Sequence, residues 1–433
     1  MTERELWDYI ETMGEKGSVY GLENMHRLLD KEGHPEKKLH IIHIAGTNGK
    51  GSTAIYIASI LKNAGFKTGV YSSPAVFDYR EKIAVNGKNI SVKSLCEYME
   101  YVKGICDVIV SDGFSSPTLF EIETAIAYKY FADKECDFAV IECGCGGRDD
   151  ATNAIENKEL AVFAKISLDH MKLLGDSIEK IAKAKSGIIK KGCSVVSIPQ
   201  DEKAYKELKK AADENECDIY TADEPLKIKT AFTRTVFDLP GYEKLETSML
   251  GTYQPLNASV AVKAALVLRE RGFKISDGAI RKGIASAVNP GRFEVIGKNP
   301  LFIIDGAHNE DAAKVLAESM DKYLSDKPLI FICGVLADKA YDRVMELTTK
   351  RASFIITVTP PDNKRALDKQ ALADTILKYN KNVTTADSVE EAAEMAMVLA
   401  GQKQNKCAIV AYGSLSYLGR LKKYVTGGVC VRV

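Results

Sequence analysis

The sequence has no excess charge of either sign and no long hydrophobic run. Its 433 residues include 59 Lys or Arg and 59 Asp or Glu, so the formal net charge is zero. A chain without a net positive field is not expected to bind nucleic acid or an anionic membrane surface. Because no uninterrupted apolar stretch reaches about 18 residues, no membrane-spanning helix is expected either.

The N-terminus and the cysteines argue against two further classes of protein. No basic segment followed by an apolar run opens the chain, so it does not resemble a secretory signal peptide. The ten cysteines form no spaced framework, which predicts free thiols in a reducing, cytoplasmic compartment. Cys143 and Cys145 could hold a metal, but no second Cys/His pair stands at ligand spacing, so a structural role is favoured.

Short apolar segments alternate with amphipathic helical patterns along most of the chain. This alternation predicts an α/β fold whose mainly parallel sheet is covered by helices on both faces. Between residues 230 and 249, alternating polarity and turn residues indicate a small antiparallel excursion. Among the expected elements are strands at 39–45, 138–143 and 160–167, and helices at 116–132 and 177–189.

A chain of this length is expected to form two or three domains. The clearest boundary signal is Asn289-Pro290-Gly291, after which the strand–helix rhythm restarts. We therefore predict an N-terminal P-loop domain at 1–289 and a smaller, Rossmann-like α/β domain at 290–433.

A glycine-rich loop follows the first strong strand and leads directly into a helix. In such a loop the glycines let backbone N–H groups approach phosphates, Lys50 supplies positive charge, and Ser52 can reach Mg²⁺. The strict P-loop pattern is not met, because Ile44 stands at its first glycine and Gly51 separates Lys50 from Ser52. A glycine-rich turn that merely caps the helix is the alternative. The candidate phosphate-binding residues are Thr47, Asn48, Gly49, Lys50, Gly51, Ser52 and Thr53.

Lys185 stands out on physical grounds. In the helix expected from Ser177, it shares the apolar face with Ile178, Ile181 and Ala182. An unpaired ammonium on that face is costly. A lysine whose charged end reaches water at the edge of the stripe is the alternative.

The loop and a series of further motifs resemble the folylpolyglutamate synthase and dihydrofolate synthase family, within the Mur ligase superfamily. The matches occur in family order over nearly the whole chain. They are Gly21-Leu22-Glu23-Asn24-Met25, Ala45 to Ser52, Ser72-Ser73-Pro74, Leu119-Phe120-Glu121, Glu142 to Arg148, Asp150-Ala151-Thr152-Asn153, Leu168-Asp169-His170, Lys185 to Lys190, Gly291-Arg292-Phe293-Glu294 and Asp305-Gly306-Ala307-His308-Asn309.

The resemblance implies a set of site residues. Mg²⁺ would be held by Ser73, Glu142 and His170, together with Ser52. Lys185 would be carbamylated by CO₂, and a monovalent cation could accompany Mg²⁺. ATP would contact Asn257, Arg292, Asp305 and His308 in addition to the loop; for Asn257, capping of the helix N-terminus is the alternative. The catalytic residues implied are Lys50, Lys185, Asp305 and His308.

The resemblance also implies an activity. A carboxylate of a folate or dihydropteroate would attack ATP to give an acyl phosphate, and L-glutamate would then form the amide. A monomer is expected. The alternatives are a cell-wall Mur ligase, which adds an amino acid to a UDP-muramyl substrate, and a nucleotide-binding switch without ligase activity. Cell-wall ligases usually carry a UDP-binding domain before the loop, and too few residues precede Gly46 to expect one.

Overall fold

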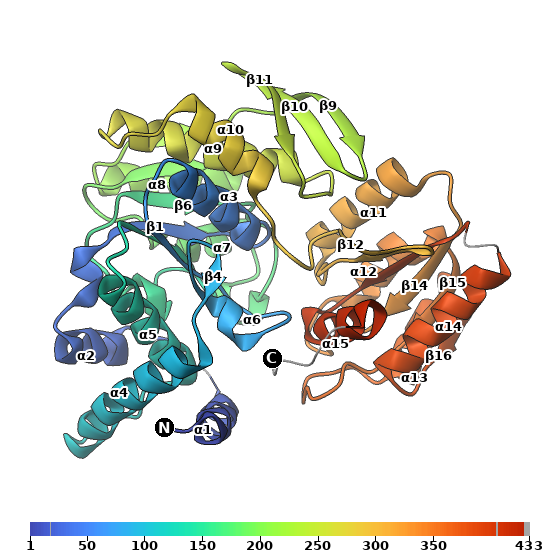
Figure 1. Ribbon diagram of the computed structural model, residues 1–433, viewed down its shortest axis with the longest axis horizontal. Helices are drawn as coiled ribbons and strands as arrows, with labels where there is room; N and C mark the ends of the chain where they lie inside the picture. The colour runs from blue at the N-terminus through green and yellow to red at the C-terminus, as the bar shows by residue number, and fades with distance from the viewer. Residues whose placement is uncertain (18, 404–405, 428–433) are drawn as a thin grey trace.

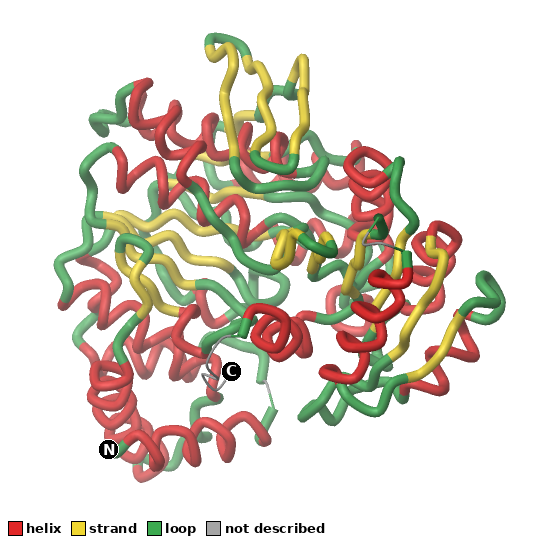
Figure 2. The backbone as a smooth tube through the Cα atoms, turned by 45° about the vertical axis from the view of Figure 1, so that its right-hand side comes forward, coloured by secondary structure: helices red, strands yellow, loops and turns green. Residues whose placement is uncertain are grey.

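The structure confirms the α/β class. It is a computed structural model that describes residues 1–17, 19–403 and 406–427. Figure 1 shows two large groups of strands and helices side by side, with a small sheet projecting above the first. Figure 2 shows that helices flank the strands of both groups. The described helices include none that is long and apolar enough to cross a membrane.

The first sheet has eight strands in the order β4-β3-β2-β5-β1-β6-β7-β8. Six neighbouring strands run parallel, namely β2, β5, β1, β6, β7 and β8. Strands β3 and β4 are antiparallel and lie at one edge of the sheet. The strands are β1 (His40–Ala45), β2 (Thr68–Tyr71), β3 (Ile83–Val85), β4 (Lys88–Asn89), β5 (Phe138–Glu142), β6 (Leu160–Phe163), β7 (Ser194–Ser197) and β8 (Ile219–Thr221).

Helices bury both faces of this sheet. Every residue of β5 and β6 is buried, and all of β1 is buried after His40, as expected for parallel strands in the middle of a sheet. One apolar cluster lies under α3, α9 and α10, and a second under α1, α2, α4 and α5. The helices are α1 (Glu3–Glu15), α2 (Glu23–Glu32), α3 (Lys50–Asn63), α4 (Val92–Ser111), α5 (Leu119–Asp133), α6 (Met171–Leu174), α7 (Ile178–Ser186), α8 (Glu202–Glu214), α9 (Gln254–Glu270) and α10 (Asp277–Ser286).

The expected antiparallel excursion is a three-stranded sheet. Its strands β9 (Leu226–Ala231), β10 (Arg234–Leu239) and β11 (Tyr242–Thr247) pair as consecutive hairpins in the order β11-β10-β9. Phe237 and Leu245 are buried and join the cluster under α3, α9 and α10. The small sheet therefore packs on the first large sheet's helices.

A second large sheet is built entirely from strands that follow residue 290. Its order is β12-β13-β17-β14-β15-β16, with only β12 antiparallel. The predicted boundary between 289 and 290 stays a prediction, and residues 428–433 lie outside the described chain. Its elements are β12 (Glu294–Lys298), β13 (Leu301–Ile304), α11 (Glu310–Leu324), β14 (Leu329–Cys333), α12 (Tyr341–Thr348), β15 (Ala352–Thr357), α13 (Lys369–Ile376), β16 (Val383–Thr385), α14 (Val389–Gln402), β17 (Ala408–Tyr412) and α15 (Leu415–Thr426).

Two of the expected elements are shorter than predicted, for local reasons. Strand β6 ends at Phe163 because the next residues leave the ladder: the carbonyl of Lys165 accepts hydrogen bonds from the backbone N–H groups of Thr47 and Asn48. Helix α7 ends at Ser186, and Gly187 packs so tightly against Arg148 that a Cβ there would lie 2.5 Å from the arginine Cβ. Both departures shape the edge of the sheet where the phosphate loop lies.

The helix expected at 116–132 begins at Leu119, because its first turn is capped. Thr118 accepts a hydrogen bond from the Glu121 N–H, and the Glu121 carboxylate accepts one from the Thr118 N–H.

Among the described residues no disulfide is formed, and nine cysteines are free. Cys143 is buried against His43, with 3.0 Å between Sγ and Nε2. Its surroundings agree with the structural role favoured for it.

A buried amine beside β1 has only uncharged hydrogen-bonding partners. The Nζ atom of Lys158 lies 2.9 Å from Nδ1 of His43 and 3.1 Å from Oδ1 of Asn153. Burial lowers the pKa of the Lys158 ammonium from 10.5 to about 7. Burial likewise lowers the pKa of His43 well below its usual value, and Lys158 adds to that shift.

We predict that Lys158 makes the stability of the protein depend on pH. Between pH values near 7 and 10.5, the unfolded chain binds a proton that the folded chain does not, so this residue's contribution to stability rises as the pH rises. Within that window the slope approaches about 1.4 kcal/mol per pH unit. The stability of Lys158→Met relative to wild type should therefore fall between pH of about 7.5 and about 9.5, measured by urea unfolding.

The matched control is Lys183→Met, which removes an exposed lysine. Its stability relative to wild type should be the same at both pH values. A pH-independent difference for Lys158→Met would contradict the prediction.

Candidate active site

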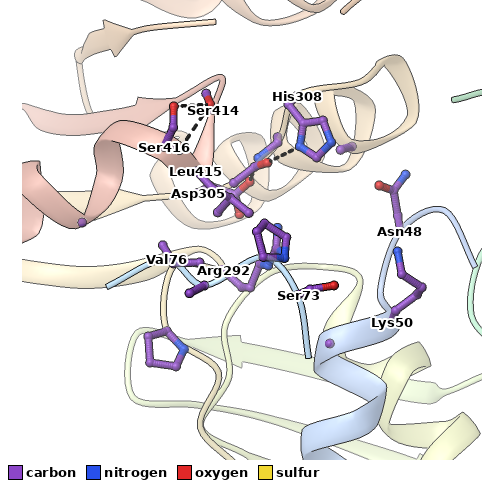
Figure 3. A pocket seen from close by; sticks show the side chains of 18 of the residues that line it. Asn48, Lys50, Ser73, Val76, Arg292, Asp305, His308, Ser414, Leu415 and Ser416 are labelled. Atoms are coloured by element: carbon purple, nitrogen blue, oxygen red, sulfur yellow. Dashed lines mark hydrogen bonds between the residues drawn. The ribbon is translucent and has the colours of Figure 1, made fainter. Parts of the chain in front are cut away.

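A large cavity formed by the described residues lies between the two large sheets. Its volume is about 2110 Å³, and both sheets contribute to its wall. The loops that follow β1, β2, β5 and β6 meet those that follow β13, β14 and β17. In open α/β folds, ligands bind outside the carboxyl ends of parallel strands. Figure 3 shows Asn48, Lys50 and Ser73 facing Asp305, His308 and Ser414 across this space.

The phosphate loop occupies one wall, and glycines allow its conformation. Gly49 has a φ of +88°, and a Cβ there would lie 2.6 Å from Oδ1 of Asn257. Gly46 also packs closely, and a Cβ there would lie 2.9 Å from the Cβ of Ala164. Helix α3 begins at Lys50, so the unpaired N–H groups of its first turn lie beside the loop. This geometry is suited to a phosphate group.

A buried carboxylate stands next to the loop lysine. The Nζ atom of Lys50 lies 3.8 Å from Oε1 of Glu142, and both side chains are largely buried. Burial raises the pKa of the Glu142 carboxyl above its usual value, although Lys50 and Arg292 act in the opposite direction. A cation bound at Glu142 would offset the cost of that burial.

The predicted Mg²⁺ ligands all line this cavity: Ser52, Ser73, Glu142 and His170. The hydroxyl of Ser52 accepts hydrogen bonds from Gln254 at 3.3 Å and Asn289 at 3.2 Å. The described residues contain no cluster of three or more His, Cys, Asp or Glu that could hold a metal, and the predicted set has only two such residues. Its three oxygen donors fit a hard cation such as Mg²⁺, and His170 is the unusual member.

Lys185 is buried, as its place on the apolar face of α7 predicted. Only 4% of the residue is exposed, and its Nζ donates a hydrogen bond to the carbonyl oxygen of Gly46 at 2.8 Å. Burial, together with the charge of Lys50, lowers the pKa of the Lys185 ammonium to about 8. The amine thus lies under the phosphate loop, within the cavity wall.

Two predicted nucleotide residues have different surroundings. Asn257 lines the cavity but does not cap α9, since Tyr253 is the N-cap residue and makes no side-chain capping bond. The capping alternative for Asn257 is therefore wrong. Thr53 is fully buried on the inner side of α3 and does not line the cavity. Its Oγ1 atom has no hydrogen-bonding partner among the described residues.

The opposite wall carries Arg292, Asp305 and His308. The carboxylate of Asp305 accepts hydrogen bonds from the hydroxyl of Tyr253 at 3.0 Å and from the backbone N–H groups of Phe293 and Ala307 at 2.8 Å each. Because its oxygens are occupied in this way, Asp305 fixes the loop that carries His308.

His308 has a defined tautomer in this structure. Its Nδ1 atom lies 2.8 Å from the carbonyl oxygen of Gly306, so Nδ1 carries the hydrogen. Burial and the nearby Lys339 ammonium lower the pKa of His308. The neutral imidazole therefore directs an unprotonated Nε2 toward the cavity.

Several residues of the two walls had no role predicted from the sequence. The Nζ atom of Lys339, which follows β14, lies 2.9 Å from Oδ1 of Asp169, which follows β6. Asn309 bonds both Asp169 and Asn48. Ser414 lies at the N-terminus of α15 and also lines the cavity. Asp169 and Asn309 stood in recognised motifs, whereas no pattern singled out Lys339 or Ser414.

Comparisons with known proteins agree with this geometry. Residues 44–265 match the Mur ligase middle domain, and residues 291–414 match the Mur ligase glutamate ligase domain. The chain is 33% identical over 414 residues to the dihydrofolate synthase/folylpolyglutamate synthase of Bacillus subtilis, covering 93% of this chain and 94% of that protein.

Solved structures show the same architecture. Mycobacterium tuberculosis folylpolyglutamate synthase, complexed with ADP and AMPPCP, superposes with a TM-score of 0.92 at 28% identity, covering 99% of this chain and 100% of that one. Escherichia coli FolC, in complex with DHPP and ADP, gives a TM-score of 0.85 at 27% identity, covering 99% and 98%. The chain therefore belongs to the folylpolyglutamate synthase and dihydrofolate synthase family of Mur ligases.

Proposed function

We propose that this protein joins L-glutamate to a carboxylate of a folate or dihydropteroate at the expense of ATP. The observation that carries the proposal is the cavity itself, in which the phosphate loop and Lys50 face His308 and Arg292 across a single space. The solved structures of two family members hold nucleotides, and one of them also holds DHPP. A cytoplasmic location and a monomeric state stay predictions.

The residues of the phosphate loop would bind and orient ATP. Backbone N–H groups from Gly49 to Ser52 receive the phosphates, and Lys50 offsets charge on the phosphoryl group as the acceptor carboxylate attacks it. The products of that step are ADP and an acyl phosphate. Mg²⁺, held by Ser52, Ser73, Glu142 and His170, would supply further positive charge at the phosphates. A monovalent cation stays a prediction.

His308 is suited to orient the amino group of the incoming amino acid. The resemblance implies that His308 contacts ATP and takes part in catalysis. Its neutral imidazole, with a bare Nε2, can accept a hydrogen bond from the amino group of glutamate, which must be an amine before it attacks the acyl phosphate. Attack then releases phosphate and leaves an amide.

Lys185 is suited to carbamylation. Its lowered pKa makes the neutral amine available near neutral pH, and the neutral amine is the form that reacts with CO₂, losing one proton to give an N-linked carbamate. The carbamate would replace a buried cation by an anion close to Lys50, where its charge is balanced. It could then orient the Mg²⁺ ligands.

The cell-wall alternative is supported less well. The middle and glutamate ligase domain matches fit Mur ligases in general, but the Bacillus subtilis relative matched over nearly its full length is a folate enzyme by name. A folate ligase and a cell-wall ligase require different acceptors, so one assay with several acceptors distinguishes them.

We expect phosphate release from ATP to require both L-glutamate and a pteridine acceptor. Purified protein is assayed with dihydropteroate, tetrahydrofolate or a UDP-muramyl peptide, and Lys50→Ala should abolish release because it removes the charge at the phosphoryl group. Release only with the UDP-sugar would move the protein to the cell-wall ligases. Release indifferent to every acceptor would contradict the ligase proposal.

Gly49→Ala should weaken ATP binding strongly, because an alanine at φ +88° is strained and its Cβ would meet Asn257. The matched control is Gly65→Ala at the end of α3, which has a φ of +96° and no atom within 4 Å of the new Cβ. Isothermal titration with an ATP analogue should show loss of affinity in the first variant only. Equal affinities in both variants would refute the assigned loop geometry.

Protein equilibrated with isotopically labelled CO₂ should show one carbamate signal by carbon NMR. At fixed dissolved CO₂, the signal should grow as pH rises from about 7 toward about 8, because the amine loses its proton there. Lys185→Met should lose both the signal and the activity, whereas Lys183→Met, on the exposed side of α7, should keep both. A wild-type protein without a signal would argue against carbamylation.

A further inference from the structure

One ion pair bridges the two walls of the cavity. The ammonium of Lys339 lies 2.9 Å from the carboxylate of Asp169, and the two side chains are only 11% and 13% exposed. Among the described residues, the other lysine ion pair between the part of the chain before residue 290 and the part after it is Lys364 with Glu15, which lies outside the cavity and whose side chains are 87% and 62% exposed. Exposed pairs contribute little, whereas breaking a buried pair leaves an uncompensated charge.

The buried pair belongs to a continuous polar network. Asn309 donates from Nδ2 to Asp169 at 3.3 Å and to Oδ1 of Asn48 at 3.0 Å. Asn48 in turn donates to Oδ1 of Asn309 at 3.2 Å and to Asp311 at 3.0 Å. Nε2 of His308 lies 4.0 Å from the same Asp169 carboxylate. The phosphate loop and the loop that carries His308 are thus tied together through Asn309, which Asp169 in turn holds.

Asp169 also reaches the proposed metal side of the cavity. Its Oδ1 accepts a hydrogen bond from the backbone N–H of His170 at 2.8 Å. One carboxylate therefore touches the loop of a proposed Mg²⁺ ligand, the amine of Lys339 and the amide of Asn309. Few other side chains could satisfy all three, because only a carboxylate accepts several hydrogen bonds while carrying a negative charge.

We propose that Asp169 and Lys339 are positioning residues that keep the cavity closed while the acyl phosphate exists. This inference rests on the proposed ligase activity. An acyl phosphate is consumed either by the glutamate amine or by water. In the second case water adds at the carbonyl carbon, phosphate leaves, and the acceptor carboxylate is regenerated, so that ATP is hydrolysed without amide formation. Holding His308 and Asn309 against the phosphate loop excludes that water.

A competing role for Lys339 makes a different prediction. If its ammonium instead bound a carboxylate of the incoming glutamate, replacing Asp169 would not reproduce the effect of replacing Lys339. If the two residues act as a pair, each single variant should show the same defect, and the double variant should be no worse than either.

The test compares Asp169→Asn, Lys339→Met and the double variant with wild type. Asparagine keeps an oxygen that can accept the His170 N–H, so the loop retains that contact. The measured quantity is phosphate released per glutamate incorporated at saturating ATP and acceptor. We expect a ratio near one for wild type and a several-fold higher ratio for all three variants. Lys339→Arg should restore most of the coupling, because it keeps the charge.

The matched control is Lys364→Met, which breaks the exposed pair between the same two parts of the chain, outside the cavity, and should leave the ratio unchanged. An unchanged ratio in Asp169→Asn and Lys339→Met would overturn the proposal. So would a raised KM for glutamate in Lys339→Met with normal behaviour of Asp169→Asn.

A substrate-free measurement separates this proposal from the proposed activity. Small-angle X-ray scattering should give a larger radius of gyration for Asp169→Asn and Lys339→Met than for wild type and Lys364→Met. Identical radii would refute the closing role even if the protein proves to be a ligase. A larger radius in a protein without ligase activity would instead contradict the proposed function and leave the ion pair's closing role supported.

Discussion

The site depends on how tightly the phosphate loop is held by the edge of the first sheet. Lys165, just after β6, accepts two backbone N–H groups of the loop through its carbonyl. The Nζ atom of Lys185 donates a hydrogen bond to the carbonyl oxygen of Gly46, and Gly49 packs closely against the side chain of Asn257. Because these contacts come from β6, α7 and α9, the loop's shape is set by three elements distant in sequence. A preorganised loop of this kind binds phosphate without reorganising during the reaction.

The second sheet completes the site through polar contacts and loop packing. Asp305 fixes the turn that presents His308, and Asn309 caps α11 while bonding the phosphate loop. On the other side, Lys422 of α15 lies 4.3 Å above the ring of Phe77, in the loop that follows Ser73. Each wall thus contacts a loop of the other that carries predicted site residues.

Much of the fold was predictable because its signals are local. Buried parallel strands such as β5 read as continuous apolar runs, and the capping box at Thr118 marks a helix start. The position of Lys185 on an apolar stripe predicted its burial, although its hydrogen bond to Gly46, distant in sequence, could not be read from spacing.

Other features were beyond the sequence because they depend on tertiary contact. Thr53 belongs to the loop motif, but it lies in helix α3 and its side chain points into the core. Lys339 lies in an unremarkable polar loop, and only the facing of two sheets brings it to Asp169. The tautomer of His308 depends on a carbonyl two residues away, which no residue pattern reveals.

The most direct test of the central claim follows an oxygen atom. An acceptor whose reacting carboxylate carries labelled oxygen is incubated with ATP, L-glutamate and the protein, and the released phosphate is analysed by mass spectrometry. If an acyl phosphate forms in this cleft, one labelled oxygen passes from the carboxylate to each phosphate released. Phosphate without label, formed while glutamate is incorporated, would contradict the account.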